Sequence, residues 1–495
     1  MVTLKKASKA LLFMTLPLNI FIIGLYYPYY NNYYSLAKAL SHPITTQAPH
    51  GPFINDPKLK AEVVFKGLNF PTSMAFLGSN DILVLEKNDG TVRRIVNGIM
   101  LPNPLLHVNV DNKGERGMLG IAVTRMKNIG NSQLTTFVFL YFTESVGMKT
   151  TGHNNTCAFS EQHQKQPLTN RLYRYELVDN NDKLVNPKLL LCLPAFPGSA
   201  HNGGRLIIGP DSNIYLVIGD VNGDTNYSSA TTLAENIEAS PPPDGRGGIL
   251  RITQDGKPVG NGILGDKYPL NLYYGYGIRN SFGIDFDPVT GKLWDTENGP
   301  RYGDEINLVE PGFNSGWMRV QGIWEPHGSR AGDTILDPEG YLVDFQGKGK
   351  YHPPEFTWYS PQVGPTAIKF LDSDKLGKQY KDDIFVGDFH LGNLYHFKLN
   401  QNRTGLALGG PLASKIAANG TDAAAVQSIV FGHGFGGITD VQVGPDGYLY
   451  VLSLYEGGDN CDPIHPRPCI QYESPLLGTI FKIVPINTAT ATTAK

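Results

Sequence analysis

Apolar runs alternate with short polar turns along most of this chain of 495 residues. A recurring phrase consists of an apolar run, a turn rich in Asp, Gly or Pro, and a second run in which apolar and polar residues alternate. It occurs at residues 79–92, 208–216, 286–294, 383–397 and 443–451, and a last strand-like run follows at 478–483. Alternation with period two predicts β-strands, and Asp-Gly or Pro-Asp-Gly between two such runs predicts a tight hairpin.

Repeated hairpins with no long helical run between them predict an all-β fold, a six-bladed β-propeller of four-stranded antiparallel blades. We place this domain at residues 61–485. Six blades would average roughly 75 residues each, above the ~40–45 of a bare blade, so we expect long loops on the top face. Such loops commonly carry function. A row of β-sandwiches is disfavoured, because no linkers separate the hairpins.

The first 34 residues (1–34) differ from the rest of the chain. Lys5, Lys6 and Lys9 precede an apolar run, which is followed by Tyr-Tyr-Pro-Tyr-Tyr at 26–30. A basic flank, an apolar core and an aromatic border predict an N-terminal membrane anchor, with a cleavable signal segment as the alternative. Under either interpretation the propeller is extracytoplasmic, and it is either membrane-anchored or secreted.

The remaining segments and the cysteines fit this location. Residues 35–60 are expected to be a linker, and the Thr/Ala-rich residues 486–495 a disordered tail. An even number of cysteines outside the cell predicts two disulfides. We expect the pairs to be Cys461 with Cys469, and Cys157 with Cys192. The formal net charge of −3 gives no electrostatic case for a nucleic-acid partner.

One candidate pair consists of a histidine and an aspartate. His201 opens the phrase His-Asn-Gly-Gly-Arg-Leu before a predicted strand, and Asp220 follows the next strand. The two side chains are therefore expected at one rim of the ring. A carboxylate that holds an imidazole is the arrangement of a general base. A structural hydrogen bond that closes the loop is the alternative.

Three further phrases carry polar groups near predicted strands. Arg279 and Asn280 offer a forked cation and an amide to a carbonyl or carboxylate ligand. The loop at residues 297–307, Glu-Asn-Gly-Pro-Arg-Tyr-Gly-Asp-Glu-Ile-Asn, carries hard oxygen donors at irregular spacing, which suits calcium. An ordinary acidic turn is the alternative there. Glu115 opens the Gly-rich phrase Glu-Arg-Gly-Met-Leu-Gly, for which a simple turn is the plainer interpretation.

Together and in this order, these phrases resemble the soluble quinoprotein glucose dehydrogenases and the aldose sugar dehydrogenases, the glucose/sorbosone dehydrogenase family. The resemblance covers about residues 63 to 483. It implies a six-bladed propeller, which agrees with the repeats. It also implies oxidation of an aldose or related hydroxyl compound that depends on pyrroloquinoline quinone (PQQ) and Ca²⁺. The substrate is then a small sugar, and an external electron acceptor reoxidises the quinone.

The resemblance implies a role for each candidate residue. His201 matches the general base, Asp220 the acid that orients it, and Arg279 the cation that polarises the quinone. The residues expected to contact the cofactor are Arg279, Asn280, Asn298 and His390.

Glu115 falls where the family has a polar contact to the substrate. The metal positions implied for Ca²⁺ are the backbone carbonyls of Gly299 and Pro300, and a structural calcium region at Asp304 and Glu305.

PQQ carries three carboxylates, and the chain departs from the family at the residues that bind them. His390 replaces a lysine, and an Arg-x-Arg-Asp phrase reads Gly-Ile-Thr-Asp at 437–440. Losing these cations would weaken the binding of the quinone by several kcal/mol, at roughly 1.5–3 kcal/mol per charge-assisted hydrogen bond. Lys369, Arg301 or His390 itself are the candidates to compensate.

Two other functions stay open. One is a calcium-dependent, lactonase-like propeller hydrolase, in which His201 and Asp220 activate water. The other is a non-catalytic propeller that binds glycans or proteins. The lost cations favour both, whereas the joint presence of His201, Asp220 and Arg279 favours the dehydrogenase.

Overall fold

The computed structural model describes residues 51–127, 134–145, 168–178, 182–221, 232–238, 240–300, 302–323, 342–359, 362–418, 421–455 and 476–486. The predicted anchor, most of the predicted linker and nearly all of the predicted tail lie outside these residues. No helix in the described part is both long and apolar enough to span a bilayer. The end of the predicted linker already contains a short strand, β1 (Phe53–Ile54).

Strands of the described residues form six sheets. The first in chain order contains β3 (Pro71–Gly78), β4 (Asp81–Glu86), β5 (Thr91–Val96), β6 (Ile99–Met100) and β7 (Leu106–His107). The second contains β8 (Met118–Lys127), β9 (Leu134–Ser145), β10 (Leu168–Val178) and β11 (Lys183–Pro194). The third contains β12 (Leu206–Ile208), β13 (Ile214–Ile218), β14 (Gly248–Ile252), β15 (Tyr273–Tyr276), β19 (Phe313–Asn314) and β20 (Lys350–Tyr351).

The other three sheets come from the second half of the chain. The fourth contains β16 (Ser281–Phe286), β17 (Leu293–Glu297), β18 (Asp304–Val309), β21 (Phe356–Trp358) and β25 (Ile416–Ala417). The fifth contains β22 (Pro365–Phe370), β23 (Ile384–Asp388), β24 (Leu394–Phe397), β26 (Val430–His433) and β1. The sixth contains β27 (Ile438–Val443), β28 (Leu449–Ser453), β29 (Gly478–Pro485) and β2 (Leu59–Leu68). Short helices are η1 (Leu233–Glu235), η2 (Leu270–Leu272), η3 (Lys378–Tyr380), η4 (Gly410–Ser414) and α4 (Ala423–Gln427).

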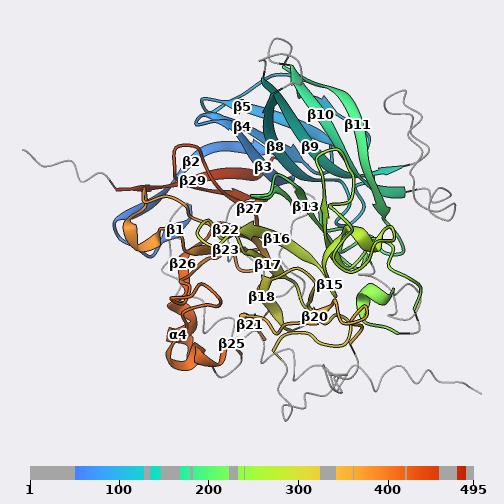
Figure 1. The fold of residues 1–495 in the computed structure, drawn as a ribbon. Helices are drawn as coiled ribbons and strands as arrows, with labels where there is room; N and C mark the ends of the chain where they lie inside the picture. Colours follow the sequence, from blue (N-terminus) through green and yellow to red (C-terminus); the bar gives the residue numbers. More distant parts are fainter. Residues whose placement is uncertain are drawn as a thin grey trace, which may run out of the picture. The chain divides into compact units, whose positions relative to one another are not determined.

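The innermost strands of the six sheets contact one another in a closed order. This order is β3, β8, β12, β16, β22, β27 and back to β3. Figure 1 shows β3, β16, β22 and β27 near the middle of the described unit, with the later strands of each sheet farther out. Because β2 pairs with β29, the sixth sheet combines strands from both ends of the chain and closes the ring. The described chain is an all-β propeller with antiparallel sheets.

All five predicted hairpins are confirmed. The turn phrases connect β4 to β5, β12 to β13, β16 to β17, β23 to β24, and β27 to β28. The prediction of uniformly four-stranded, antiparallel sheets is right only in part. Only the second and sixth sheets have four strands among the described residues. The long loops add short outer strands, and β19, β20 and β25 pair in parallel with their neighbours.

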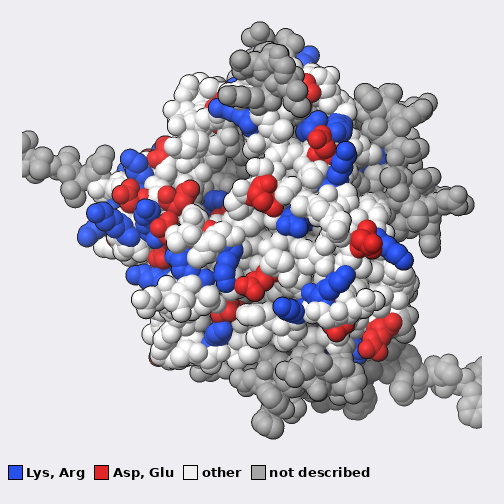
Figure 2. All heavy atoms as spheres, in the orientation of Figure 1, with Lys and Arg blue, Asp and Glu red and all other residues white. Residues whose placement is uncertain are grey.

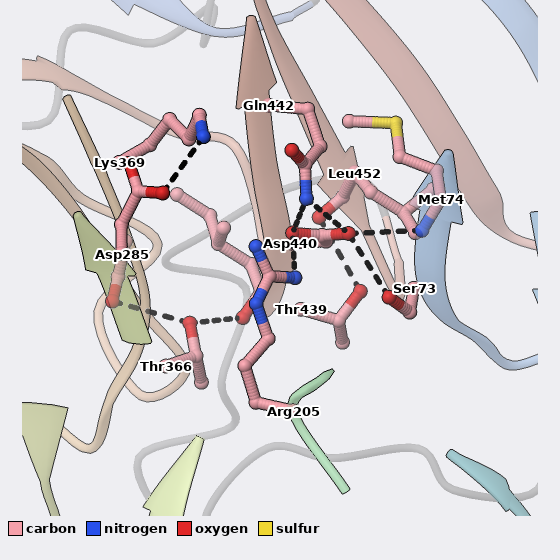
Figure 3. Close-up of polar contacts among 12 residues, drawn as sticks. Ser73, Met74, Arg205, Asp285, Thr366, Lys369, Thr439, Asp440, Gln442 and Leu452 are labelled. Carbon is pink, nitrogen blue, oxygen red and sulfur yellow. Dashed lines mark hydrogen bonds and ion pairs between the residues drawn. The ribbon is translucent and has the colours of Figure 1, made fainter. Parts of the chain in front are cut away.

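A buried ion pair joins three of the innermost strands at the centre. Arg205, just before β12, donates from Nη1 to Oδ1 of Asp440 on β27 at 2.5 Å. The other carboxylate oxygen accepts from the Ser73 hydroxyl at 3.2 Å and from the Met74 backbone N–H at 2.9 Å, both on β3. Figure 3 shows these groups, together with Gln442, directed at Asp440. A buried charge pair is tolerated when further hydrogen bonds support it. Here they satisfy both oxygens of Asp440, whereas Nε of Arg205 has no hydrogen-bond partner among the described residues.

Candidate active site

His201 lies in the loop before β12, in a backbone conformation that few residues adopt. Its φ is +59°, in the left-handed region that disfavours a side chain with a β-carbon. The backbone N–H of His201 donates to Oε2 of Glu115 at 2.6 Å. Glu115 thus fixes the backbone of the predicted base, and its predicted contact with substrate stays a prediction.

The predicted His–Asp pair forms. Nδ1 of His201 lies 2.6 Å from Oδ1 of Asp220, which follows β13. The two residues are only 7% and 2% exposed. A carboxylate can only accept here, so Nδ1 carries the proton and Nε2 is left as the acceptor. The arrangement is that of an imidazole ready to remove a proton.

Gly219 lets His201 and Arg279 approach each other. A β-carbon at this position would lie 2.5 Å from the Arg279 carbonyl oxygen and 2.7 Å from the His201 carbonyl oxygen. Asp220 also donates its backbone N–H to the Arg279 carbonyl at 2.9 Å. The base and the cation therefore belong to one rim, held together through the backbone.

Arg279 and Asn280 lie between β15 and β16. Nη1 of Arg279 donates to the carbonyl oxygens of Asn298 at 2.8 Å and Gly299 at 3.0 Å. Its backbone N–H donates to Oε1 of Glu297 at 2.7 Å. Nε of Arg279 and Oδ1 of Asn280 are buried and have no partner within the described protein. Orphaned donors and acceptors beside a base fit a polar ligand.

The carbonyls predicted to bind calcium lie beside Arg279. The Gly299 carbonyl accepts from Arg279 and from Nε2 of Gln362 at 2.8 Å. A calcium ion at this carbonyl would share it with these donors or displace them. Pro300 is half-buried beside it. Nδ2 of Asn298 donates to the Pro365 carbonyl at 2.7 Å, which positions this amide between two sheets.

Asp304 and Glu305, predicted to bind structural calcium, are engaged by protein donors. Asp304 accepts three backbone N–H groups, from Gly299, Val363 and Gly364, at 2.8–2.9 Å. Glu305 accepts from the Gly322 backbone N–H and three side chains. Among the described residues, no group of three or more His, Cys, Asp or Glu is arranged to hold a metal ion. Their predicted metal role stays a prediction.

A cluster of buried acids lies behind Arg279; Glu297 and Glu305 belong to the predicted 297–307 phrase, whereas sequence reasoning missed Asp295. Asp295, Glu297 and Glu305 are at most 1% exposed. Burial, with repulsion from Glu305, raises the pKa of Asp295 to about 8, and burial raises that of Glu305 to about 7. Burial and both neighbours also raise the pKa of Glu297. The side chains of Asn307 and Ser281 lie beside the Asp295 carboxyl and partly oppose the rise in its pKa.

The other side of the candidate site is aromatic and has no basic side chain at position 437, and the buried acid Asp388 precedes Phe389. A β-carbon at Gly437 would lie 2.9 Å from Cε1 of Tyr455 and 3.1 Å from Cε2 of Phe389. Rings therefore occupy the space beside the position where the family phrase has its first arginine. His390 follows Phe389 and lies against Gly364; the surrounding protein lowers its pKa, and Asp304 partly opposes this shift.

Of the two described candidates to replace the lost cations, Lys369 is engaged elsewhere. Nζ of Lys369 donates to Asp285 at 2.9 Å, and Figure 3 shows this pair near Arg205 and Asp440. Lys369 is therefore not free to meet a carboxylate. Arg301 lies outside the described residues. His390 therefore remains the one described candidate, as a ring that is either neutral or protonated. Figure 2 shows acidic and basic residues interspersed over the face drawn, without a single-sign region.

Trp317 is a residue of this site that sequence reasoning missed. Its indole Nε1 donates to Oδ2 of Asp220 at 2.9 Å. The Arg279 guanidinium carbon lies 5.4 Å from the indole ring centre. The only signal in the sequence is a Gly-Trp dipeptide in a long loop, and nothing in that signal places it beside Asp220.

Of the predicted disulfides, only one cysteine can be placed. Cys192 is buried on β11. Cys157, Cys461 and Cys469 lie outside the described residues, so both pairings stay predictions.

The fold and the site define a class: a β-propeller with a His–Asp pair and an arginine at one rim, facing orphaned polar atoms. The sequence matches the Glucose / Sorbosone dehydrogenase family over residues 68–460. The chain belongs to this family.

Relatives and solved structures agree with this membership. Aldose sugar dehydrogenase YliI of Escherichia coli is 25% identical over 406 residues, which cover 81% of this chain and 91% of that protein. Quinoprotein glucose dehydrogenase B of Acinetobacter calcoaceticus is 27% identical over 282 residues, which cover 54% of each chain. A putative oxidoreductase (glucose dehydrogenase) from Thermus thermophilus has a TM-score of 0.58 and 25% identity, covering 86% of this chain and all of that one. These relatives are dehydrogenases of sugars.

Proposed function

We propose that this chain is a sugar dehydrogenase of the quinoprotein type, dependent on PQQ and Ca²⁺, and that each of its six sheets is one blade. The observation that carries the proposal is the convergence of His201, Asp220 and Arg279 at one rim. Family membership supports the same reaction class. The substrate is an aldose or a related hydroxyl compound.

The chain's own residues supply the proton chemistry. Nε2 of His201 accepts the proton of the C1 hydroxyl, while Asp220 stabilises the imidazolium that forms. PQQ, when bound, would accept the hydride. Arg279 would face a reactive carbonyl, because its buried Nε is a donor without a partner among the described residues, whereas the buried Oδ1 of Asn280 would accept a hydrogen bond from a donor on the ligand. The Gly299 and Pro300 carbonyls would hold the calcium ion.

The residues fit the quinone at its reactive end and differ at its carboxylate end. Around Gly437, aromatic rings fill the space where the family has a cation. This aromatic wall favours the second candidate, a lactonase-like hydrolase that uses the same His201–Asp220 pair on water. Lactone hydrolysis with calcium and without quinone distinguishes the two.

The test of the proposed function is reconstitution with PQQ and Ca²⁺, followed by dye reduction with a panel of sugars. His201→Ala should lower turnover by about 10²–10⁴-fold, the usual contribution of a general base, and leave quinone binding intact. His396→Ala is the matched control, because His396 also contacts a carboxylate, Asp383, at 2.8 Å but on β24. Absence of quinone binding, or equal loss in both variants, would refute the proposal.

We infer that the enzyme works outside the cytoplasm and transfers electrons to an external acceptor. The basis is the sequence of residues 1–34, which combines a basic flank with an apolar run. Fractionation of cells that express the full chain should recover it in the membrane, or in the medium if the segment is cleaved. Recovery in the cytosol would contradict this inference.

A further inference from the structure

We propose that Trp317 is a positioning residue that links the predicted base to the predicted cation. It contacts the carboxylate that holds His201 and the guanidinium of Arg279 with two different parts of one indole. The proposal rests on the proposed function for its kinetic consequences. Its structural consequence, the orientation of the His201 ring, can be measured without it.

Trp317 is itself held firmly in place. It lies in the loop after β19 and is 5% exposed. Its backbone N–H donates to the Gly277 carbonyl at 3.0 Å. Its carbonyl accepts from Nδ2 of Asn236 at 2.8 Å, at the end of η1. The indole is therefore fixed relative to two other loops of the same sheet, and it can transmit this fixed position to side chains that it contacts.

The first contact fixes the Asp220 carboxylate. Oδ1 faces Nδ1 of His201, and Oδ2 accepts the indole N–H. With a partner on each oxygen, the carboxylate cannot rotate about its Cβ–Cγ bond without breaking a hydrogen bond. Its orientation in turn selects the imidazole tautomer with the proton on Nδ1, which leaves Nε2 to accept a proton from substrate.

The second contact fixes the cation. A guanidinium over an indole face is attracted by the negative face of the ring. Arg279 also donates to the Asn298 and Gly299 carbonyls, so its fork lies between the indole and the 297–307 loop. Because one indole makes both contacts, it links the carboxylate of the base to the cation through side chains, in addition to the backbone contacts at Gly219 and Asp220.

The test separates the indole N–H from the ring. Trp317→Phe keeps an aromatic face for Arg279 and removes the hydrogen bond to Asp220. We expect kcat to fall roughly 10–100-fold, the equivalent of one hydrogen bond to a charged group, with KM nearly unchanged. Because Phe is smaller, a second variant carries 3-benzothienylalanine at this position, which keeps the ring shape but has no N–H. Both should behave alike.

A readout that needs no activity is the tautomer of His201 in the apo protein, followed by ¹⁵N NMR with His201→Ala for assignment. The wild type should show the proton on Nδ1, and Trp317→Phe should show a rise in the Nε2–H tautomer. Trp358→Phe is the matched control, because Trp358 is 2% exposed and its Nε1 has no partner among the described residues.

The outcomes separate this proposal from the proposed function. A changed tautomer without any dehydrogenase activity would support the positioning role and contradict the proposed reaction. An unchanged tautomer in both Trp317 variants would overturn the positioning role, whatever the activity. A loss of kcat equal to that of Trp358→Phe would also overturn it, since the effect would then be that of any lost buried tryptophan.

Discussion

The two sides of the candidate site are built differently. On the reactive side, His201, Asp220, Trp317 and Arg279 are connected by hydrogen bonds and a cation–ring contact, and most of these groups are buried. On the opposite side, the space beside Gly437 is filled by the rings of Phe389 and Tyr455.

This difference separates the residues proposed to carry out the reaction from the residues expected near the carboxylates of the ligand. The reactive side retains what is needed to remove a proton and polarise a carbonyl, and these demands are set by the reaction. Under the proposed function, the opposite side would meet only the part of the cofactor that does not react, so a change there would leave the chemistry intact. Affinity for a trianionic ligand is then the property that we expect to depend most on this side.

The largest effect is expected where the reactive side is packed most tightly. Gly219→Ala places a β-carbon within 2.7 Å of two backbone oxygens, so the His201 and Arg279 segments must separate. Because a small misplacement of reacting groups costs about 10²-fold, turnover should fall at least that much. The measurement is steady-state dye reduction with the melting temperature. Gly409→Ala is the control, since a β-carbon there meets nothing within 4 Å. Full activity in Gly219→Ala would show that the close approach is not required.

A large effect on stability is expected from the acids behind Arg279. Asp295 has a folded-state pKa of about 8, above its ordinary value of 3.8, so the folded state binds its proton more tightly than the unfolded state. The contribution of this group to stability is therefore fully present below about pH 4 and is lost as the pH rises toward about 8. Asp295→Asn removes this ionisation and should stabilise the protein at pH 8 by about 2 kcal/mol or more, and hardly at pH 4.

Urea unfolding from pH 4 to 8 in the presence of a chelator measures this change. Asp372→Asn, at an exposed site, is the matched control and should leave the pH dependence unchanged. Repeating the titration with calcium tests the predicted metal role of Glu305, because a bound cation would abolish the loss of stability at high pH. A pH dependence that is identical in Asp295→Asn and the wild type would contradict the expectation for the cluster.

The fold was predictable because hairpin turns are local. Pro-Asp-Gly phrases and period-two alternation act within about ten residues, and these signals located all five hairpins. The extra outer strands were not predictable, since β19, β20 and β25 are only two residues long and pair in parallel with strands that are distant in the sequence. Strands this short have no periodicity to detect.

The site was predictable to the extent that it lies in short phrases. His201 and Asp220 are 19 residues apart and end up 2.6 Å apart because each adjoins a predicted strand. Trp317 is 97 residues from Asp220 in sequence, so its contact follows from the packing of loops. Glu115 illustrates a different limit. The sequence identified it as a site residue, and the structure adds a hydrogen bond from the His201 backbone N–H that the sequence did not predict.

A smaller effect is expected from restoring one charge to the aromatic side. His390→Lys adds a cation where the quinone carboxylates are expected and should tighten PQQ binding about tenfold, within the range for one charge-assisted hydrogen bond. The binding should also become more sensitive to salt. Equilibrium binding followed by cofactor absorbance, at two ionic strengths, measures both.

Val289→Lys is the control for net charge, because Val289 is 59% exposed in the β16–β17 turn, at the opposite end of these strands from Glu297. Tightening in His390→Lys alone supports a carboxylate end that lacks cations. If the wild type binds as tightly as His390→Lys, the aromatic side does not limit affinity, and the contrast between the two sides has no consequence for the ligand.

The smallest effect is expected at Glu115, where the structure separates a hydrogen bond from a charge. Glu115→Gln keeps an oxygen that can accept the His201 N–H, so the left-handed backbone is retained and turnover should change less than about threefold.

The lost charge should instead change the pKa of Lys87. Burial lowers the pKa of Lys87 to about 8, and Glu115 opposes that shift, so the variant should lower the pKa further. The pH dependence of Lys87 acylation, read by mass spectrometry, measures it. Glu115→Ala removes the acceptor as well and should reduce turnover clearly more than Glu115→Gln does. Equal losses in the two variants would mean that the charge acts on substrate, as the sequence predicted, and that the backbone hydrogen bond is incidental.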